Sequence, residues 1–291
     1  MAATDNRVVL MTDRTDLDPD LKPGTVVTKI DGEDARKLLE GRAEAAWAEG
    51  GGFSSPQRAR LYEFRIPLRD EEQGKKHTIT ITDDSKERDI ELASETEARS
   101  WPHWYNRPKN LNQVGGSCWY GKLTSGIGYI YLRRIDGSAG KGMKEAFSTH
   151  ADAKGWIIDL RGNGGGGYGS EVYEALRSLP RPLAGIIDAG CFSAGETMAR
   201  DLVRYANARL FGSPTAGSSS AKRTWSFPSG IGTLSLPRRS RWGISGQPIE
   251  FNGIRPDENV EAVPEEVQRG QNSAILRAEE YLVKVTDAET R

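Results

Sequence analysis

The residue whose position best suits covalent chemistry is Ser193, in the segment Cys-Phe-Ser-Ala-Gly-Glu at 191–196. A short apolar stretch at 183–187 precedes it, and a helix-like run over 197–203 follows it. A serine at such a strand-to-helix junction presents its hydroxyl at a helix N-terminus, where free backbone N–H groups and the helix dipole stabilise negative charge. Nucleophilic serine chemistry needs this arrangement, because a tetrahedral oxyanion must be held as it forms. An ordinary N-cap serine shows the same pattern.

A second segment that could take part in chemistry is 155–167, Gly-Trp-Ile-Ile-Asp-Leu-Arg-Gly-Asn-Gly-Gly-Gly-Gly. Its apolar part at 156–158 is typical of a strand covered on both faces, and a helix is expected over 170–179. The glycines at 164–167 let backbone N–H groups approach a ligand with no side chain in the way. Phosphate-binding and dinucleotide-binding loops need other spacings and partners, so neither fits well. A flexible turn stays open as the alternative.

Taken in this order, the two segments resemble the carboxyl-terminal processing peptidases, also called tail-specific proteases, and more broadly the serine peptidases related to the tricorn core protease. The likeness extends over most of the chain, because five motifs occur in the family's order with compatible spacing. They are Gly-Ile-Gly-Tyr-Ile-Tyr-Leu at 126–132, Asp-Leu-Arg-Gly-Asn-Gly-Gly-Gly at 159–166, Ser-Ala-Gly-Glu at 193–196, Phe-Gly-Ser-Pro-Thr-Ala-Gly at 211–217 and Gly-Ile-Arg-Pro-Asp at 253–257. Each motif is weak to moderate alone, and the ordered set is strong.

The resemblance implies a fold and a site. The fold is a crotonase/ClpP-like layered α/β serine protease domain over 126–291, preceded by a small PDZ-like β-rich domain over 7–95 and a connector over 96–125. In the site, Ser193 is the nucleophile. The other residues are the oxyanion donors Ala194, Gly164 and Gly165 and the supporting residues Asp159, Arg161 and Glu196. No cofactor is implied, and no metal-ligand spacing is visible in the sequence.

One position departs from the family pattern and leaves the general base open. In the processing peptidases a lysine follows the glycine that corresponds to Gly217, and here that residue is Ser218. The next lysine, Lys222, is the candidate base if burial lowers its pKa from about 10.4 toward 7–8, with Ser218 orienting it. Lys222 fits a solvated lysine equally well. The tricorn-like branch takes its base from a histidine upstream of the PDZ-like domain, a segment we expect this chain to lack, and His103 is a weaker alternative.

The composition limits the classes of partner. Of the 291 residues, 36% are hydrophobic and 28% charged, which is typical of a globular protein, and the net charge is −1. This balance gives no reason to expect nucleic acid or an anionic membrane as a partner. No apolar run approaches the roughly 20 residues of a membrane span, and residues 1–4 do not begin a signal peptide. The native compartment stays open, although the resemblance suggests a periplasmic or secreted bacterial protein.

The cysteines, one histidine and a basic cluster have less specific interpretations. Cys118 and Cys191 show no disulfide framework, and Cys191 is predicted to be a small buried residue behind Ser193. His77 is predicted to be exposed. The cluster Arg-Arg-Ser-Arg at 238–241 is predicted to be a solvated loop, with contact to an acidic peptide as the alternative.

The remaining patterns predict two kinds of architecture. In the first hundred residues a strand at 8–11, a helix over 35–48, and alternating strands at 61–68 and 77–82 favour the PDZ-like unit. Such a domain binds an extended peptide by strand addition and captures its C-terminal carboxylate, and a small β-rich domain without a ligand is the alternative. From residue 126 the chain alternates strand and helix. We also expect β-structure within 223–250 and a helix over 264–285.

Together these observations predict a serine endopeptidase that cleaves unfolded or C-terminally recognised polypeptides through an acyl-enzyme on Ser193. The alternative is a catalytically impaired peptide- or ligand-binding protein on the same scaffold, because the family's lysine position holds Ser218. A third interpretation, a thioester-handling enzyme of the wider crotonase-like superfamily, is disfavoured by the PDZ-like unit. Polypeptide is the expected partner, and assembly into a homo-oligomer stays open.

Overall fold

The structure is a computed structural model of the 291-residue chain. It describes residues 1–4, 7–50, 52–70, 72–83, 86–94, 107–240, 243–244 and 246–289. The chain forms two compact units. Unit 1 comprises Met1–Lys109 with Asn259–Arg277, and unit 2 comprises Asn110–Glu258 with Ala278–Arg291. In the described residues, no helix is long and apolar enough to cross a membrane.

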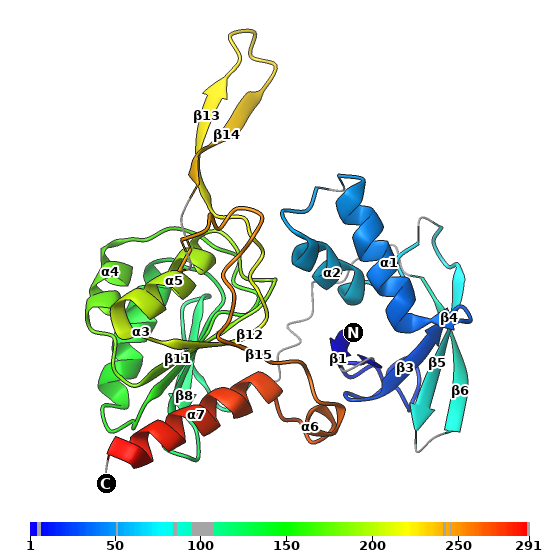
Figure 1. The fold of residues 1–291 in the computed structure, drawn as a ribbon, viewed down its shortest axis with the longest axis horizontal. Coiled ribbons are helices and arrows are strands. Elements are labelled where there is room, and N and C mark those ends of the chain that lie inside the picture. The colour runs from blue at the N-terminus through cyan, green and yellow to red at the C-terminus, as the bar shows by residue number, and fades with distance from the viewer. Residues whose placement is uncertain are drawn as a thin grey trace. The chain divides into compact units, whose positions relative to one another are not determined.

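Unit 1 is built on an antiparallel sheet with the strand order β1-β2-β3-β5-β6, and the short β4 pairs with β3 (Figure 1). The strands are β1 Ala2–Thr4, β2 Arg7–Val9, β3 Val26–Ile30, β4 Glu33–Asp34, β5 Lys76–Asp83 and β6 Lys86–Ala93. The helices are α1 Ala35–Ala48, α2 Pro56–Arg65 and α6 Pro264–Gln268, and α7 Ser273–Glu289 begins here. Ile30, Leu39, Phe64 and Ile79 belong to the buried core between sheet and helices. The PDZ-like identity of this unit stays a prediction.

Three sequence-based expectations for this unit are wrong. The strand expected at 61–68 lies mostly in α2, because Ser55 caps the helix by accepting a hydrogen bond from the Arg58 N–H (3.3 Å) and Pro56 occupies the first turn. His77 is buried, and its Nδ1 lies 2.7 Å from Asp31 Oδ2. The single helix expected over 264–285 is two helices, α6 and α7, with Gly270 at a φ of 71° between them.

Unit 2 is a mixed sheet with helices, as the α/β expectation requires. The strand order is β15-β12-β11-β10-β9-β8-β7, in which β9 to β12 run parallel and β7 and β8 are antiparallel. The strands are β7 Asn112–Val114, β8 Cys118–Lys122, β9 Gly128–Leu132, β10 Trp156–Asp159, β11 Leu183–Ile187, β12 Arg209–Gly212 and β15 Glu258–Asn259. The helices α3 Gly137–Thr149, α4 Ser170–Arg177 and α5 Ala194–Ala206 connect the parallel strands in turn.

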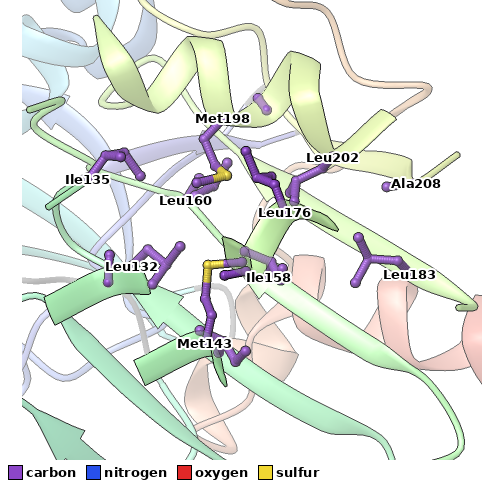
Figure 2. Close-up of a cluster of buried hydrophobic side chains, with 14 of the residues drawn as sticks. Leu132, Ile135, Met143, Ile158, Leu160, Leu176, Leu183, Met198, Leu202 and Ala208 are labelled. Atoms are coloured by element: carbon purple, nitrogen blue, oxygen red, sulfur yellow. The ribbon is translucent and has the colours of Figure 1, made fainter. Parts of the chain in front are cut away.

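The core of unit 2 lies between this sheet and its helices. Figure 2 shows Met143, Leu176, Met198 and Leu202 from the helices gathered with side chains such as Ile158 from the sheet. The strands β9 to β11 are buried throughout, which explains their nearly continuous apolar sequence. Because parallel strands end at the same edge of a sheet, the loops that follow β10, β11 and β12 are brought together there.

A separate two-stranded hairpin completes unit 2. It consists of β13 Ser220–Ser226 and β14 Thr233–Ser240, which pair antiparallel with each other. Figure 1 shows the hairpin extending away from the larger sheet of the unit. The β-structure expected within 223–250 is confirmed by these strands.

Candidate active site

Three loops at the carboxyl edge of the parallel strands meet around Ser193. The Phe192 N–H donates to the Asn163 carbonyl (3.1 Å), which joins the loop after β11 to the loop after β10. The Ser193 N–H donates to the Ser218 carbonyl (2.9 Å), which joins it to the loop after β12. The Asn163 side chain also donates to the Leu132 carbonyl at the end of β9 (2.6 Å). The first four sequence motifs therefore converge on one serine.

Ser193 has a backbone conformation that L-residues rarely adopt. Its φ is 57° and its ψ is −122°, and it is the residue immediately before α5. A serine on a sharp, strained turn between strand and helix has its hydroxyl presented away from the backbone at the helix N-terminus, as in nucleophile elbows. Strain of this kind costs about 1–3 kcal/mol and persists only where surrounding contacts enforce it. The outlier therefore marks Ser193 as the candidate functional residue.

The contacts that enforce this turn centre on the Glu196 carboxylate. One of its oxygens, Oε1, accepts hydrogen bonds from Thr215 Oγ1 (2.6 Å) and the Gly217 N–H (2.7 Å). The other, Oε2, accepts from the N–H groups of Ser218 (2.9 Å) and Ser193 (3.2 Å). Burial raises the pKa of Glu196 above its ordinary value, and these four hydrogen bonds act in the opposite direction. Glu196 thus ties the serine turn to the loop after β12.

The fifth motif joins the same network through Thr215. This fully buried threonine exchanges two hydrogen bonds with Ile254: the Ile254 N–H donates to Thr215 Oγ1 (2.7 Å), and the Thr215 N–H donates to the Ile254 carbonyl (3.0 Å). Gly253, with a φ of 71°, lies so close to Thr215 that a Cβ there would be 2.3 Å from the Thr215 carbonyl oxygen. Only glycine therefore fits at this crossing.

The glycine loop after β10 packs directly against the serine. A Cβ on Gly165 would lie 2.7 Å from Ser193 Cβ and 3.2 Å from Ser193 Oγ, and the residue has a φ of 73°. In contrast, a Cβ on Gly164 would meet no atom within 4 Å. The lack of a side chain at Gly165 is thus what leaves room for the serine hydroxyl.

The expected oxyanion donors are not all free. The Gly164 N–H donates to the Arg133 carbonyl (3.0 Å), and the Gly165 N–H donates to Asn163 Oδ1 (2.9 Å). In this structure the two glycine N–H groups therefore hold the loop instead of facing an anion. The Ala194 N–H lies in the first turn of α5, where helical N–H groups have no intrahelical partner, and it makes no hydrogen bond among the described residues.

Asp159 and Arg161 form a buried ion pair under the glycine loop. Arg161 Nε lies 2.9 Å from Asp159 Oδ1, and Arg161 Nη2 lies 2.5 Å from Asp159 Oδ2. Tyr129 OH donates to the same carboxylate (2.7 Å). All three side chains are buried. The pair fixes the end of β10 and makes no described contact with Ser193.

The thiol next to the serine is unsuited to nucleophilic chemistry. Cys191 is fully buried, and burial, with the charges of Glu196, Asp188 and Asp159 as smaller causes, raises the pKa of its thiol well above the ordinary value. A thiol must lose its proton to become a nucleophile. Ser193 is therefore the candidate nucleophile at this turn.

Comparison with known proteins finds a family model that matches the part of the chain containing this turn. Residues 126–181 and 168–260 match the model described as peptidase family S41. Residues 126–260 belong to peptidase family S41. Among curated proteins no sequence matches the chain.

Solved structures resemble this chain in fold. Mature CPAF in complex with lactacystin has a TM-score of 0.63 at 14% identity, with 100% of this chain and 82% of that chain covered. Mature CPAF alone has a TM-score of 0.64 at 13% identity, covering 98% and 80%. A putative peptidase from Parabacteroides merdae ATCC 43184 has a TM-score of 0.52 at 17% identity, covering 86% and 97%. The S41 family and fold indicate a serine protease.

The S41 site does not include the expected lysine. Lys222 lies on β13 opposite Pro237, its side chain is exposed, and it makes no hydrogen bond or ion pair among the described residues. Ser218 does lie at the site, but its contacts there are made by its backbone. His103 falls outside the described residues.

Glu250 is an acidic residue of this domain that the sequence patterns did not single out. Glu250 precedes Phe251, whose N–H donates to the Gly217 carbonyl (2.8 Å) beside the serine turn. Its Oε2 is buried and accepts no hydrogen bond from the described residues. A buried carboxylate oxygen without a donor, in a segment bonded to the loop after β12, is a candidate partner for a catalytic group. The signal in the sequence is that Glu250 is the sole acidic residue between Asp201 and Asp257.

Proposed function

We propose that this protein is a serine endopeptidase that cleaves unfolded or C-terminally recognised polypeptides through an acyl-enzyme on Ser193. The observation that carries the proposal is the strained backbone of Ser193 at the N-terminus of α5. The family match to residues 126–260 supports peptidase chemistry at this site.

The chemistry has two steps. In the first, Ser193 Oγ attacks the peptide carbonyl carbon, its proton passes to a base, and the C–N bond breaks as that proton moves to the leaving amine. In the second, water attacks the acyl-enzyme ester and releases the new C-terminal carboxylate, which restores the serine hydroxyl. The Ala194 N–H is the proposed donor to the oxyanion in both steps, and losing one such donor costs about 3–4 kcal/mol. The Gly164 and Gly165 N–H groups join it only if the glycine loop exchanges its present hydrogen bonds.

The base is the open part of this proposal. Lys222 remains the candidate, with Ser218 as its orienting partner, and His103 is the weaker alternative. A lysine becomes a base at neutral pH when burial favours its uncharged form, and Lys222 is exposed. The proposal therefore requires β13 to bring Lys222 into the site when substrate binds, or another group to take its place.

Recognition of a C-terminus is proposed for unit 1. Its antiparallel sheet and helices are compatible with a PDZ-like domain, which adds a peptide strand to a sheet edge and binds its carboxylate through backbone N–H groups.

The test is cleavage of unfolded casein by wild type, Ser193→Ala and a matched serine variant, Ser148→Ala, at the exposed end of α3. Ser193→Ala is expected to lower turnover by about 10³-fold or more, and Ser148→Ala to leave it unchanged. Lys222→Ala and His103→Ala, measured in the same assay, then identify the base. Labelling by a serine-directed fluorophosphonate reports the nucleophile independently of the substrate.

An inactive wild type that also resists the fluorophosphonate would overturn the peptidase proposal. The observation that favours the second candidate, a peptide-binding protein on the same scaffold, is that Lys222 is exposed and makes no described contact with Ser193. Peptide binding without turnover, unchanged in Ser193→Ala, would establish that function.

A further inference from the structure

The hairpin formed by β13 and β14 has two chemically different faces. The directly opposed pairs Trp225–Leu234 and Arg223–Leu236 lie on one face. The pairs Thr224–Ser235 and Ser226–Thr233 lie on the other, and Thr224 Oγ1 is 2.7 Å from Ser235 Oγ. Successive side chains of a strand alternate between faces, so the sequence itself makes the hairpin amphipathic.

The apolar face of the hairpin is uncovered. The exposed fractions are 42% for Trp225, 45% for Phe227, 85% for Ile231, 44% for Leu234 and 45% for Leu236. The two strands pair only with each other in the described part of the chain, so each also has an outer edge with unpaired backbone groups. A two-stranded hairpin is marginally stable alone, and apolar side chains gathered on an uncovered face make it a candidate binding surface.

The charge of the hairpin and its flanking sequence indicates the chemistry of a partner. Between Asp201 and Glu250 the sequence contains no acidic residue. The cations on the two strands of the hairpin are Lys222, Arg223, Arg238 and Arg239. The Arg223 guanidinium lies 5.1 Å from the centroid of the Trp225 ring, at the border of the apolar face. A partner with apolar side chains and carboxylates complements this surface, whereas a second copy of the hairpin would repel it.

The hairpin starts at the candidate active site. Ser219, the residue before β13, donates from its Oγ to the Ser193 carbonyl (3.0 Å), and the Ser218 carbonyl accepts from the Ser193 N–H. A polypeptide that adds to the outer edge of β13 as an extended strand is therefore led toward the serine.

We propose that the β13–β14 hairpin is the surface that captures the substrate, and that it selects extended, acidic polypeptide segments with apolar side chains. The apolar face takes leucine-like side chains, the cations take Asp and Glu, and the free strand edge takes the backbone. This inference rests on the proposed function and specifies its class of substrate. It does not depend on unit 1 or on the identity of the base.

The test uses the full chain carrying Ser193→Ala, so that binding is measured without cleavage. The probes are three fluorescein-labelled peptides of twelve residues, read by fluorescence anisotropy: one alternating Leu and Glu, one with Lys for every Glu, and one with Ser for every Leu. The Leu/Glu peptide is expected to bind at least about tenfold more tightly than either other peptide at 50 mM salt. The preference for Glu over Lys is expected to shrink at 500 mM salt, because exposed charges are screened.

Three variants locate the binding site. Leu234→Ser with Leu236→Ser is expected to weaken the Leu/Glu peptide about fivefold or more, and Leu17→Ser in unit 1, at a matched 46% exposure, is expected to change nothing. Arg223→Glu is expected to reduce the preference for Glu over Lys. Urea unfolding of each variant shows that the chain is still folded.

The outcomes separate this inference from the proposed function. If the chain cleaves casein and no hairpin variant changes peptide binding, the inference is overturned and the peptidase proposal stands. Hairpin-dependent binding in a chain that never cleaves would support the inference and remove the peptidase. The inference also fails if Leu234→Ser with Leu236→Ser leaves peptide binding unchanged. Such a variant could instead alter only the oligomeric mass in solution, which would indicate a second copy as the partner, or only cosedimentation with phosphatidylglycerol vesicles, which would indicate a membrane.

Discussion

The turn at Ser193 and the β13–β14 hairpin are adjacent in space and close in sequence, but they are stabilised in opposite ways. At the turn, Glu196 accepts four hydrogen bonds from two segments, the turn itself and the loop after β12, and the side chain is fully buried. On the hairpin, four large apolar side chains are 42–45% exposed and another, Ile231, is 85% exposed.

This difference fits the two functions proposed for these regions. A nucleophile must be held in one geometry, and buried, fully satisfied hydrogen bonds provide that rigidity. A surface that accepts many extended sequences needs apolar area and free backbone groups without a fixed partner. Variants of the turn should therefore lower stability, whereas variants of the hairpin should weaken peptide binding and leave stability almost unchanged.

The largest effect on stability is expected from Glu196→Gln. Either orientation of the amide would place an NH₂ group against two donors, the Thr215 hydroxyl and Gly217 N–H or the N–H groups of Ser218 and Ser193. Leaving two buried donors unsatisfied is expected to cost about 2–4 kcal/mol in the free energy of unfolding, measured in urea. The matched control is Glu174→Gln in the exposed pair with Lys144, expected to change it by less than about 1 kcal/mol.

The stability difference between wild type and Glu196→Gln is also expected to depend on pH. Burial raises the pKa of Glu196 in the folded chain above its unfolded value of 4.5, so the folded state binds the proton more tightly. Its contribution to stability is therefore fully present below pH 4.5 and is lost as pH rises through the folded pKa. The stability advantage of wild type over Glu196→Gln should grow as pH falls toward 4.5. An advantage that shrinks over this range would mean that the hydrogen bonds outweigh burial.

Much of this arrangement could be predicted from the sequence, because it depends on local pattern. The helix over 35–48 has the bounds of α1, and the apolar run at 156–158 lies in β10. The alternation of strand and helix from residue 126 likewise gave the α/β class. The failure at 61–68 has a local cause as well, since Leu61 and Phe64 suit helical spacing as well as a strand.

The contacts of the site could not be predicted, because they join segments far apart in the chain. Glu196 bonds Thr215, 19 residues away, and the Thr215 hydroxyl accepts from Ile254, 39 residues away. The positive φ of Ser193 and the engagement of the Gly164 N–H by Arg133 depend on the same packing. The exposure of Lys222 follows from the pairing of β13 with β14, which extends away from the core.

A smaller loss is expected where the turn meets the glycine loop. Gly165→Ala forces a φ of 73° on alanine and places its Cβ 2.7 Å from Ser193 Cβ, so it should cost about 1–3 kcal/mol and lower casein cleavage by about 10²-fold or more. Gly164→Ala, one residue earlier, is the matched control, because a Cβ there would meet no atom within 4 Å, and it should retain both stability and casein cleavage. Equal behaviour of the two variants would show that the close approach at Gly165 does not shape the site.

The smallest effect on stability is expected on the hairpin. Leu236→Ser removes a side chain that is already 45% exposed, so the free energy of unfolding should change by less than about 0.5 kcal/mol, while Leu202→Ala in the core should cost about 2–5 kcal/mol. Urea unfolding of both variants measures the contrast. If Leu236→Ser were as destabilising as Leu202→Ala, the apolar face would be packed against the chain itself, and the hairpin would then be part of the folded core instead of a surface held open for substrate.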